Sequence, residues 1–90
     1  MSKVGCKTVL VTGASSGIGK VTCIYLAERG YAVVGTSRSI ARLSDLQQLA
    51  SERSLPITAV ELDINTEEAI NWALPELIFK HGPIDVLVNN

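Results

Sequence analysis

A glycine-rich segment near the start of the chain has the residue types best suited to binding a ligand. It runs from Thr12 to Gly19 as Thr-Gly-Ala-Ser-Ser-Gly-Ile-Gly, so Gly13, Gly17 and Gly19 follow a Gly-x-x-x-Gly-x-Gly spacing. Glycine permits a tight turn and a close approach of the backbone to a bound group, and the free N–H groups at the start of a helix attract anions. Between a strand and a helix, such a segment predicts a site for the pyrophosphate of a dinucleotide.

The residues on either side of this segment predict a strand before it and a helix after it. Residues 8–11 are apolar or β-branched without alternation, which is typical of a strand covered on both faces in a parallel sheet. Apolar residues then recur at helical spacing, and Gly30 supplies a helix stop. The stripe expected to face the core consists of Ile18, Val21 and Tyr25, broadened by Ile24, Leu26 and Ala27. The glycine segment therefore joins a strand to a helix.

Three further strands and two further helices are predicted along the rest of the chain. The strands cover residues 32–36, 57–62 and 84–88. One helix is expected to begin at a Ser39 cap, and the next follows a capping box of Asn65 and Glu68, with a kink or break at Pro75. The apolar positions of these helices are Ile40, Leu43, Leu46 and Ala50 in the first and Ile70, Ala73, Leu74, Leu77 and Ile78 in the second.

This alternation of strands and helices predicts the fold class. Strands that alternate with helices of these lengths form a parallel sheet with right-handed crossovers. We therefore expect an α/β fold, a Rossmann-like parallel sheet of βαβαβαβ order, as the incomplete half of a doubly wound fold. No linker or repeat divides the chain, so residues 1–90 are expected to form one domain.

A phosphate loop of the Walker type is a competing interpretation of the glycine segment, because Lys20 follows Gly19. The spacing does not fit, since Ala14 occupies the place of the first glycine and Val21 stands where a Ser or Thr would coordinate magnesium. A purely structural turn is the other alternative, and it is the usual interpretation of an isolated glycine pattern. Lys20 itself is expected to point to solvent, with contact to the cofactor phosphates from the first helical turn as the alternative.

Two separated motifs resemble those of the short-chain dehydrogenase/reductase family. Residues 12–19 match the family's Thr-Gly-x-x-x-Gly-x-Gly cofactor loop, and the closing residues 84–90, Ile-Asp-Val-Leu-Val-Asn-Asn, match the end of its fourth strand as far as the second Asn of Asn-Asn-Ala-Gly. The resemblance covers the whole chain. It implies a cofactor-binding Rossmann portion, and it places the family's catalytic Ser, Tyr and Lys further along a longer chain. No catalytic residue is therefore expected among these 90.

The resemblance also implies which residues would contact the cofactor. Asp63 would bond the adenine amino group, the Ile64 backbone would lie beside the ring, and Asn90 would line the adenine-ribose side. A carboxylate at a helix entry is the structural alternative for Asp63. The expected cofactor-binding residues are Gly13, Ser15, Ser16, Gly17, Ile18, Gly19, Ser37, Arg38, Asp63, Ile64 and Asn90.

The end of the second predicted strand indicates which nicotinamide cofactor fits. NAD-binding Rossmann proteins place an acidic residue there, which accepts hydrogen bonds from the ribose 2′-OH and repels a 2′-phosphate. Here that place falls at Ser37, and Arg38 follows it with a guanidinium suited to a phosphate. The sequence therefore predicts NADP(H), with a solvated surface arginine as the alternative interpretation of Arg38.

The remaining composition excludes several other classes. A net charge of −1 with no basic run gives no field for nucleic acid or anionic lipid, and a single histidine, His81, cannot build a multi-histidine metal site. Neither Tyr25 nor Tyr31 has a lysine four residues later, so neither fits the family's catalytic pair. Two cysteines and the lack of a long apolar run predict a cytoplasmic protein without a disulfide framework or a membrane span.

Together with the predicted NADP(H) preference, the resemblance implies the cofactor-binding part of an oxidoreductase, whose longer parent would take a small carbonyl or alcohol substrate. A hydrophobic content of 47% is high for 90 residues and is expected of an incomplete domain. Two alternatives remain open. One is a module that binds a nucleotide without chemistry, and the other is a homo-oligomer in which the apolar residues 86–88 pair with a second copy.

Overall fold

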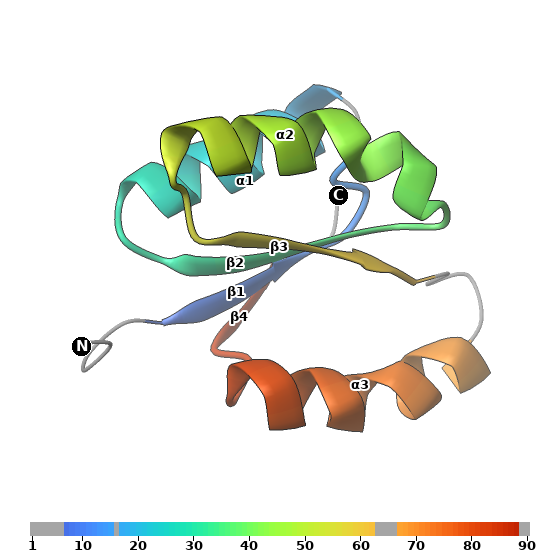
Figure 1. Ribbon diagram of the computed structural model, residues 1–90. Coiled ribbons are helices and arrows are strands. Elements are labelled where there is room, and N and C mark those ends of the chain that lie inside the picture. Colours follow the sequence, from blue (N-terminus) through green and yellow to red (C-terminus); the bar gives the residue numbers. More distant parts are fainter. Residues whose placement is uncertain (1–6, 16, 63–66, 89–90) are drawn as a thin grey trace.

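Four parallel strands form one sheet with helices on both of its faces (Figure 1). The computed structural model describes residues 7–15, 17–62 and 67–88. In chain order the elements are β1 Thr8–Val11, α1 Gly17–Glu28, β2 Ala32–Ser37, the 3-10 helix η1 Ile40–Leu43, α2 Ser44–Arg53, β3 Ile57–Glu61, α3 Glu67–His81 and β4 Val86–Val88. This order confirms the predicted Rossmann-like α/β fold.

The strand order across the sheet is β3-β2-β1-β4. The chain thus moves outward from β1 through β2 to β3 and then crosses back to place β4 on the other side of β1. Helices α1 and α2 cover one face, and α3 covers the other (Figure 1). Because all the strands are parallel, their carboxyl ends lie along the same edge of the sheet, where ligands bind in open α/β folds.

The core is split between the two faces of the sheet. In β1, Val9 and Val11 pack toward α1 and α2, whereas Leu10 packs toward α3 with Leu77 of that helix. This explains the apolar run without alternation, since every residue of β1 is buried.

The described helices include none that is long and apolar enough to span a membrane.

The buried face of α1 differs from the expected one. Helix α1 buries Gly19, Cys23 and Ala27, which recur every four residues. Of the predicted stripe, Ala27 is buried and Ile24 and Leu26 pack partly buried against the core. The other members point outward, with Ile18 76%, Val21 64% and Tyr25 52% exposed. The reason is proximity: the small side chains let the helix axis approach the sheet, and the bulky residues cannot fit beneath it.

The second predicted helix begins later than expected. Residues 40–43 form the 3-10 helix η1, and the α-helix begins at Ser44. Ser39 has the extended backbone of a cap residue before η1, but its side chain makes no capping hydrogen bond. Leu43, fully buried, is the residue that the turn of η1 directs into the core.

Helix α3 runs without a break from Glu67 to His81 with Pro75 inside it, so the break that was one of the two predicted outcomes is wrong. A proline removes the N–H that would bond the carbonyl four residues earlier, here that of Asn71. Both residues lie on the exposed side of the helix, where water can bond the freed carbonyl. Ile78, expected to face inward, is 41% exposed, whereas Leu77 is buried.

Strand β4 forms one edge of the described sheet, and β3 forms the other. β4 begins at Val86, two residues later than predicted, and pairs only with β1. Its start is fixed by Asp85, whose N–H donates to the carbonyl of Thr8 (2.9 Å) and whose carboxylate accepts the N–H of Thr8 (2.8 Å). Asp85 therefore links the start of β4 to the start of β1.

Candidate functional site

The glycine loop, residues 12–19, leaves the carboxyl end of β1 and is held by both neighbouring strands. The N–H of Thr12 donates to the carbonyl of Val88 in β4 (3.0 Å), and the Thr12 hydroxyl donates to the same oxygen (3.4 Å). On the other side, the N–H of Ala14 donates to the carbonyl of Thr36 in β2 (2.9 Å). The loop is therefore fixed before α1 begins.

The backbone of the loop requires glycine at two positions. Gly13 has a φ of 63° and Gly17 a φ of 44°, values that side-chain-bearing residues rarely adopt. Nothing lies within 4 Å of the position that a Cβ on Gly17 would occupy, so the space in front of this residue is open. Gly17 is also the first residue of α1, where free N–H groups and the helix dipole favour an anion.

Gly35 is a residue whose importance the sequence analysis missed. A Cβ at this position would lie 3.0 Å from the Cβ of Ala14, 3.3 Å from the Sγ of Cys23 and 3.3 Å from the Cδ2 of Leu46. The bare backbone of Gly35 thus lets the loop, α1 and α2 all approach β2. Its position between the β-branched residues Val34 and Thr36, in the middle of a strand, was the available signal.

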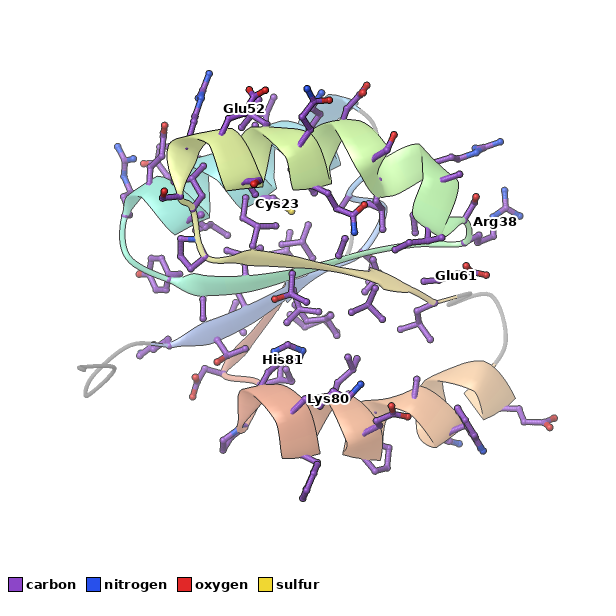
Figure 2. All side chains as sticks on the ribbon, in the orientation of Figure 1. Cys23, Arg38, Glu52, Glu61, Lys80 and His81 are labelled. Carbon is purple, nitrogen blue, oxygen red and sulfur yellow. The ribbon has the colours of Figure 1, made fainter. Side chains whose placement is uncertain are left out.

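The end of β2 brings together polar groups from two segments. Ser37 is buried, and its hydroxyl lies 3.3 Å from the hydroxyl of Ser15 in the glycine loop. The N–H of Ser39 donates to the Ser37 hydroxyl at 3.4 Å. Arg38 is exposed and projects from the same end of the sheet (Figure 2). The side chain at position 37 is neutral, so this end of β2 carries no acid of its own.

Four of the predicted cofactor-binding residues, Ser16, Asp63, Ile64 and Asn90, lie outside the described residues. Leu62 is the last described residue before Asp63, and Val88 is the last before Asn90. Both form hydrogen bonds to residues of the site. The N–H of Leu62 donates to the carbonyl of Ser37 (2.8 Å), and the carbonyl of Val88 accepts from Thr12. Strands β3 and β4 therefore both end at the edge of the sheet that carries the glycine loop.

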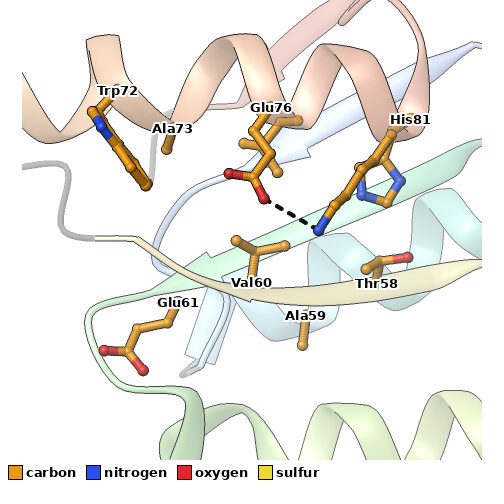
Figure 3. Close-up of a pocket in the computed structure, with 10 residues that line it drawn as sticks. Thr58, Ala59, Val60, Glu61, Trp72, Ala73, Glu76 and His81 are labelled. Atoms are coloured by element: carbon orange, nitrogen blue, oxygen red, sulfur yellow. Dashed lines mark ion pairs between the residues drawn. The ribbon is translucent and has the colours of Figure 1, made fainter.

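A cavity of about 340 Å³ lies elsewhere, between β3 and α3 (Figure 3). Val60, Ala73 and Leu77 contribute apolar lining, Trp72 stands at one side, and an ion pair joins Glu76 to Lys80 at 3.3 Å. The ion pair is exposed on both sides, so it contributes little to stability. This cavity is on the face of the sheet opposite α1 and is separate from the glycine loop.

Groups able to catalyse proton transfer or bind metal are sparse near the loop. Within the described ranges, no three His, Cys, Asp or Glu side chains gather as a metal site. Burial raises the pKa of the Cys23 thiol to about 11, which keeps it protonated and unreactive at neutral pH. Tyr25 packs its ring against the guanidinium of Arg29, 3.7 Å from the ring centroid, on the outer side of α1.

Comparison with known proteins places this arrangement in a family. Residues 7–90 match the family model of the short chain dehydrogenases. Farnesol dehydrogenase of Aedes aegypti is 41% identical over 85 residues, which are 93% of this chain and 35% of that enzyme. The NADPH-dependent pterin aldehyde reductase of Arabidopsis thaliana is 35% identical over 91 residues, covering 99% of this chain and 36% of the reductase.

Solved structures agree with the sequence matches. A metagenomic short-chain oxidoreductase in complex with NADP superimposes with a TM-score of 0.86 at 31% identity, over 93% of this chain and 38% of its own. A variant of actinorhodin polyketide ketoreductase with NADPH gives a TM-score of 0.89 at 29% identity, over 100% of this chain and 34% of its own. The chain thus spans about a third of the length of these relatives. With the matched family model and the shared fold, it belongs to the short-chain dehydrogenase family.

Proposed function

We propose that this chain is the cofactor-binding part of an NADP(H)-dependent oxidoreductase that acts on a carbonyl or alcohol substrate. The observation that carries the proposal is the glycine loop, in which Gly13 and Gly17 have positive φ angles at the start of the 12-residue helix α1. Bonds to β2 and β4 hold this loop in place, so its N–H groups are arranged for an anion before one binds. The nicotinamide supplies hydride transfer when bound, and the residues of this chain bind and orient the cofactor.

Each expected contact follows from its place along the carboxyl edge of the sheet. The pyrophosphate would lie over the loop, near Gly13, Ser15, Ser16, Gly17, Ile18 and Gly19. The open space in front of Gly17 and the exposure of Ile18 at 76% suit a ligand that covers them. Asp63, Ile64 and Asn90 would line the adenosine, because the strands before them end beside the loop.

The end of β2 supports a 2′-phosphate in this proposal. Ser37 is neutral, and Arg38 is exposed and makes no ion pair among the described residues. A free guanidinium can form charge-assisted hydrogen bonds to a phosphate. The names of several relatives agree, since one is an NADPH-dependent reductase and two solved neighbours carry NADP or NADPH.

Titration calorimetry with NADPH and NADH tests the proposal. NADPH should bind more tightly, and Arg38→Asp should weaken NADPH binding about tenfold or more, because a hydrogen bond to a charged group contributes roughly 1.5–3 kcal/mol. Arg53→Asp is the matched control, since Arg53 is exposed and only weakly paired with Glu28 at 3.7 Å. Equal affinity for both nucleotides, unchanged by Arg38→Asp, would contradict the choice of NADP.

In the same proposal the protein works in a reducing compartment such as the cytoplasm, which suits a chain with only two cysteines. Residues 1–90 would act there as one domain, with the small-molecule substrate bound by other parts of a longer protein.

A second candidate function, self-association, has one observation in its favour. Val86 is 42% and Leu87 60% exposed on β4, which is an edge strand of the described sheet. Such an edge can pair with a second copy of the chain. Size-exclusion chromatography tests this candidate: a dimer that Leu87→Lys converts to a monomer would support it, and a monomer at high concentration would exclude it.

A further inference from the structure

Glu61, on β3, places a carboxylate beside the end of β2. The residues at the end of β2 itself carry no acidic side chain. In the parallel pairing of β2 with β3, Glu61 is the register partner of Ser37. Neighbouring strands lie about 4.8 Å apart, and side chains of paired residues point to the same face of a sheet. Glu61 therefore stands on the face of the sheet that also carries the Ser37 and Ser15 hydroxyls.

The carboxylate of Glu61 reaches toward the turn that follows β2. Its Oε1 accepts the N–H of Ile40 at 3.4 Å, a long hydrogen bond at an exposed site. Glu61 and Arg38 lie at the same end of the sheet (Figure 2), and neither takes part in an ion pair within the described part of the chain. The carboxylate is thus only loosely held and its charge is not neutralised.

We infer that Glu61 is a cofactor-specificity residue, which lowers the preference for NADPH over NADH that Arg38 creates. The inference rests on the proposed function, which sets the 2′-phosphate beside Ser37 and Arg38. A phosphate monoester carries close to two negative charges at neutral pH, so a carboxylate on the adjacent strand repels it. The same carboxylate can accept a hydrogen bond from a ribose 2′-OH, the role that an acid at the end of β2 fulfils in NAD-binding proteins.

Removing the charge of Glu61 without changing its size tests the inference. Glu61→Gln keeps an oxygen that can accept the N–H of Ile40. Both charges are exposed to water, so we expect NADPH and 2′,5′-ADP to bind about two- to fivefold more tightly to this variant. Binding of NADH and 5′-AMP should not tighten. The gain should shrink at high salt, and Glu61→Asp, which keeps the charge, should behave like the wild type.

Glu52→Gln provides the matched control. Glu52 is also exposed, accepts a side-chain hydrogen bond from Gln48 at 3.2 Å, and lies on α2 rather than beside Ser37. This variant changes the net charge by the same amount, so it measures the general effect of removing a carboxylate. An NADPH gain in Glu61→Gln no larger than in Glu52→Gln, or an equal gain for NADH, would overturn the inference while leaving the proposed function intact. A wild-type chain that binds neither nucleotide would overturn both.

Discussion

Gly35→Ala is expected to destabilise the chain, although glycine-to-alanine changes in strands usually stabilise. An added Cβ would lie 3.0 Å from the Cβ of Ala14 and 3.3 Å from atoms of Cys23 and Leu46. The two side chains can shift slightly, but Ala14 is held through its N–H to the carbonyl of Thr36. Overpacking of this kind costs about 1–3 kcal/mol, and each 1 kcal/mol lowers the Tm of a chain this size by about 4–8 °C.

Urea unfolding of a double-mutant cycle separates this contact from other effects. Ala14→Gly alone should also destabilise, since it removes a buried methyl group and frees the unfolded backbone. When Ala14→Gly is combined with Gly35→Ala, the 3.0 Å contact between the two Cβ atoms cannot form. The double variant should therefore be at least about 1 kcal/mol more stable than the sum of the two single changes predicts. A Gly35→Ala variant as stable as the wild type, or additive effects of the two changes, would show that a Cβ at position 35 does not crowd Ala14.

Three further predictions concern the core and its titration. Thr36→Val should leave stability unchanged or raise it by up to about 1 kcal/mol in urea unfolding, because the buried Thr36 hydroxyl has no hydrogen-bond partner among the described residues; a loss above 1 kcal/mol would reveal a partner. Leu77→Ala should lower the free energy of unfolding by about 2–4 kcal/mol and Phe79→Ala by less than about 0.5 kcal/mol, since Leu77 is 4% and Phe79 89% exposed. Equal losses would show that Leu77 is not the residue through which α3 packs on the core. For Cys23, the pKa is raised from 9.0 to about 11 in the folded chain, so the folded state keeps a proton that the unfolded state loses. Stability should therefore fall between about pH 9 and 11 more steeply in the wild type than in Cys23→Ala, and parallel curves would contradict this.

The parts of the fold that the sequence predicted are those with a local signal. Branched, apolar residues favour an extended backbone in β1 and β2, and glycines favour a tight turn between β1 and α1. These are local preferences of the backbone, which do not depend on tertiary contacts. A parallel sheet follows from the alternation of strands and helices. The Rossmann-like order and the place of the glycine loop could therefore be predicted without coordinates.

The parts that could not be predicted depend on contacts between distant segments. The inner face of α1 is set by the space beneath the helix, which favours Cys23 and Ala27 over the more hydrophobic Ile18 and Tyr25. The continuity of α3 through Pro75 depends on which side of the helix faces water. The role of Gly35 and the position of Glu61 beside Ser37 depend on how the strands are paired. The register of strand pairing cannot be inferred from one sequence alone.

Binding of the dinucleotide at the glycine loop can be observed residue by residue in the backbone amide NMR signals of the chain during titration with NADPH. We expect the largest shifts on Gly13, Gly17 and Gly19 and on the residues that follow β2, with little change in α3. Shifts concentrated instead on Trp72 and the other residues around the cavity between β3 and α3, or no shifts at saturating NADPH, would show that the glycine loop does not bind the dinucleotide.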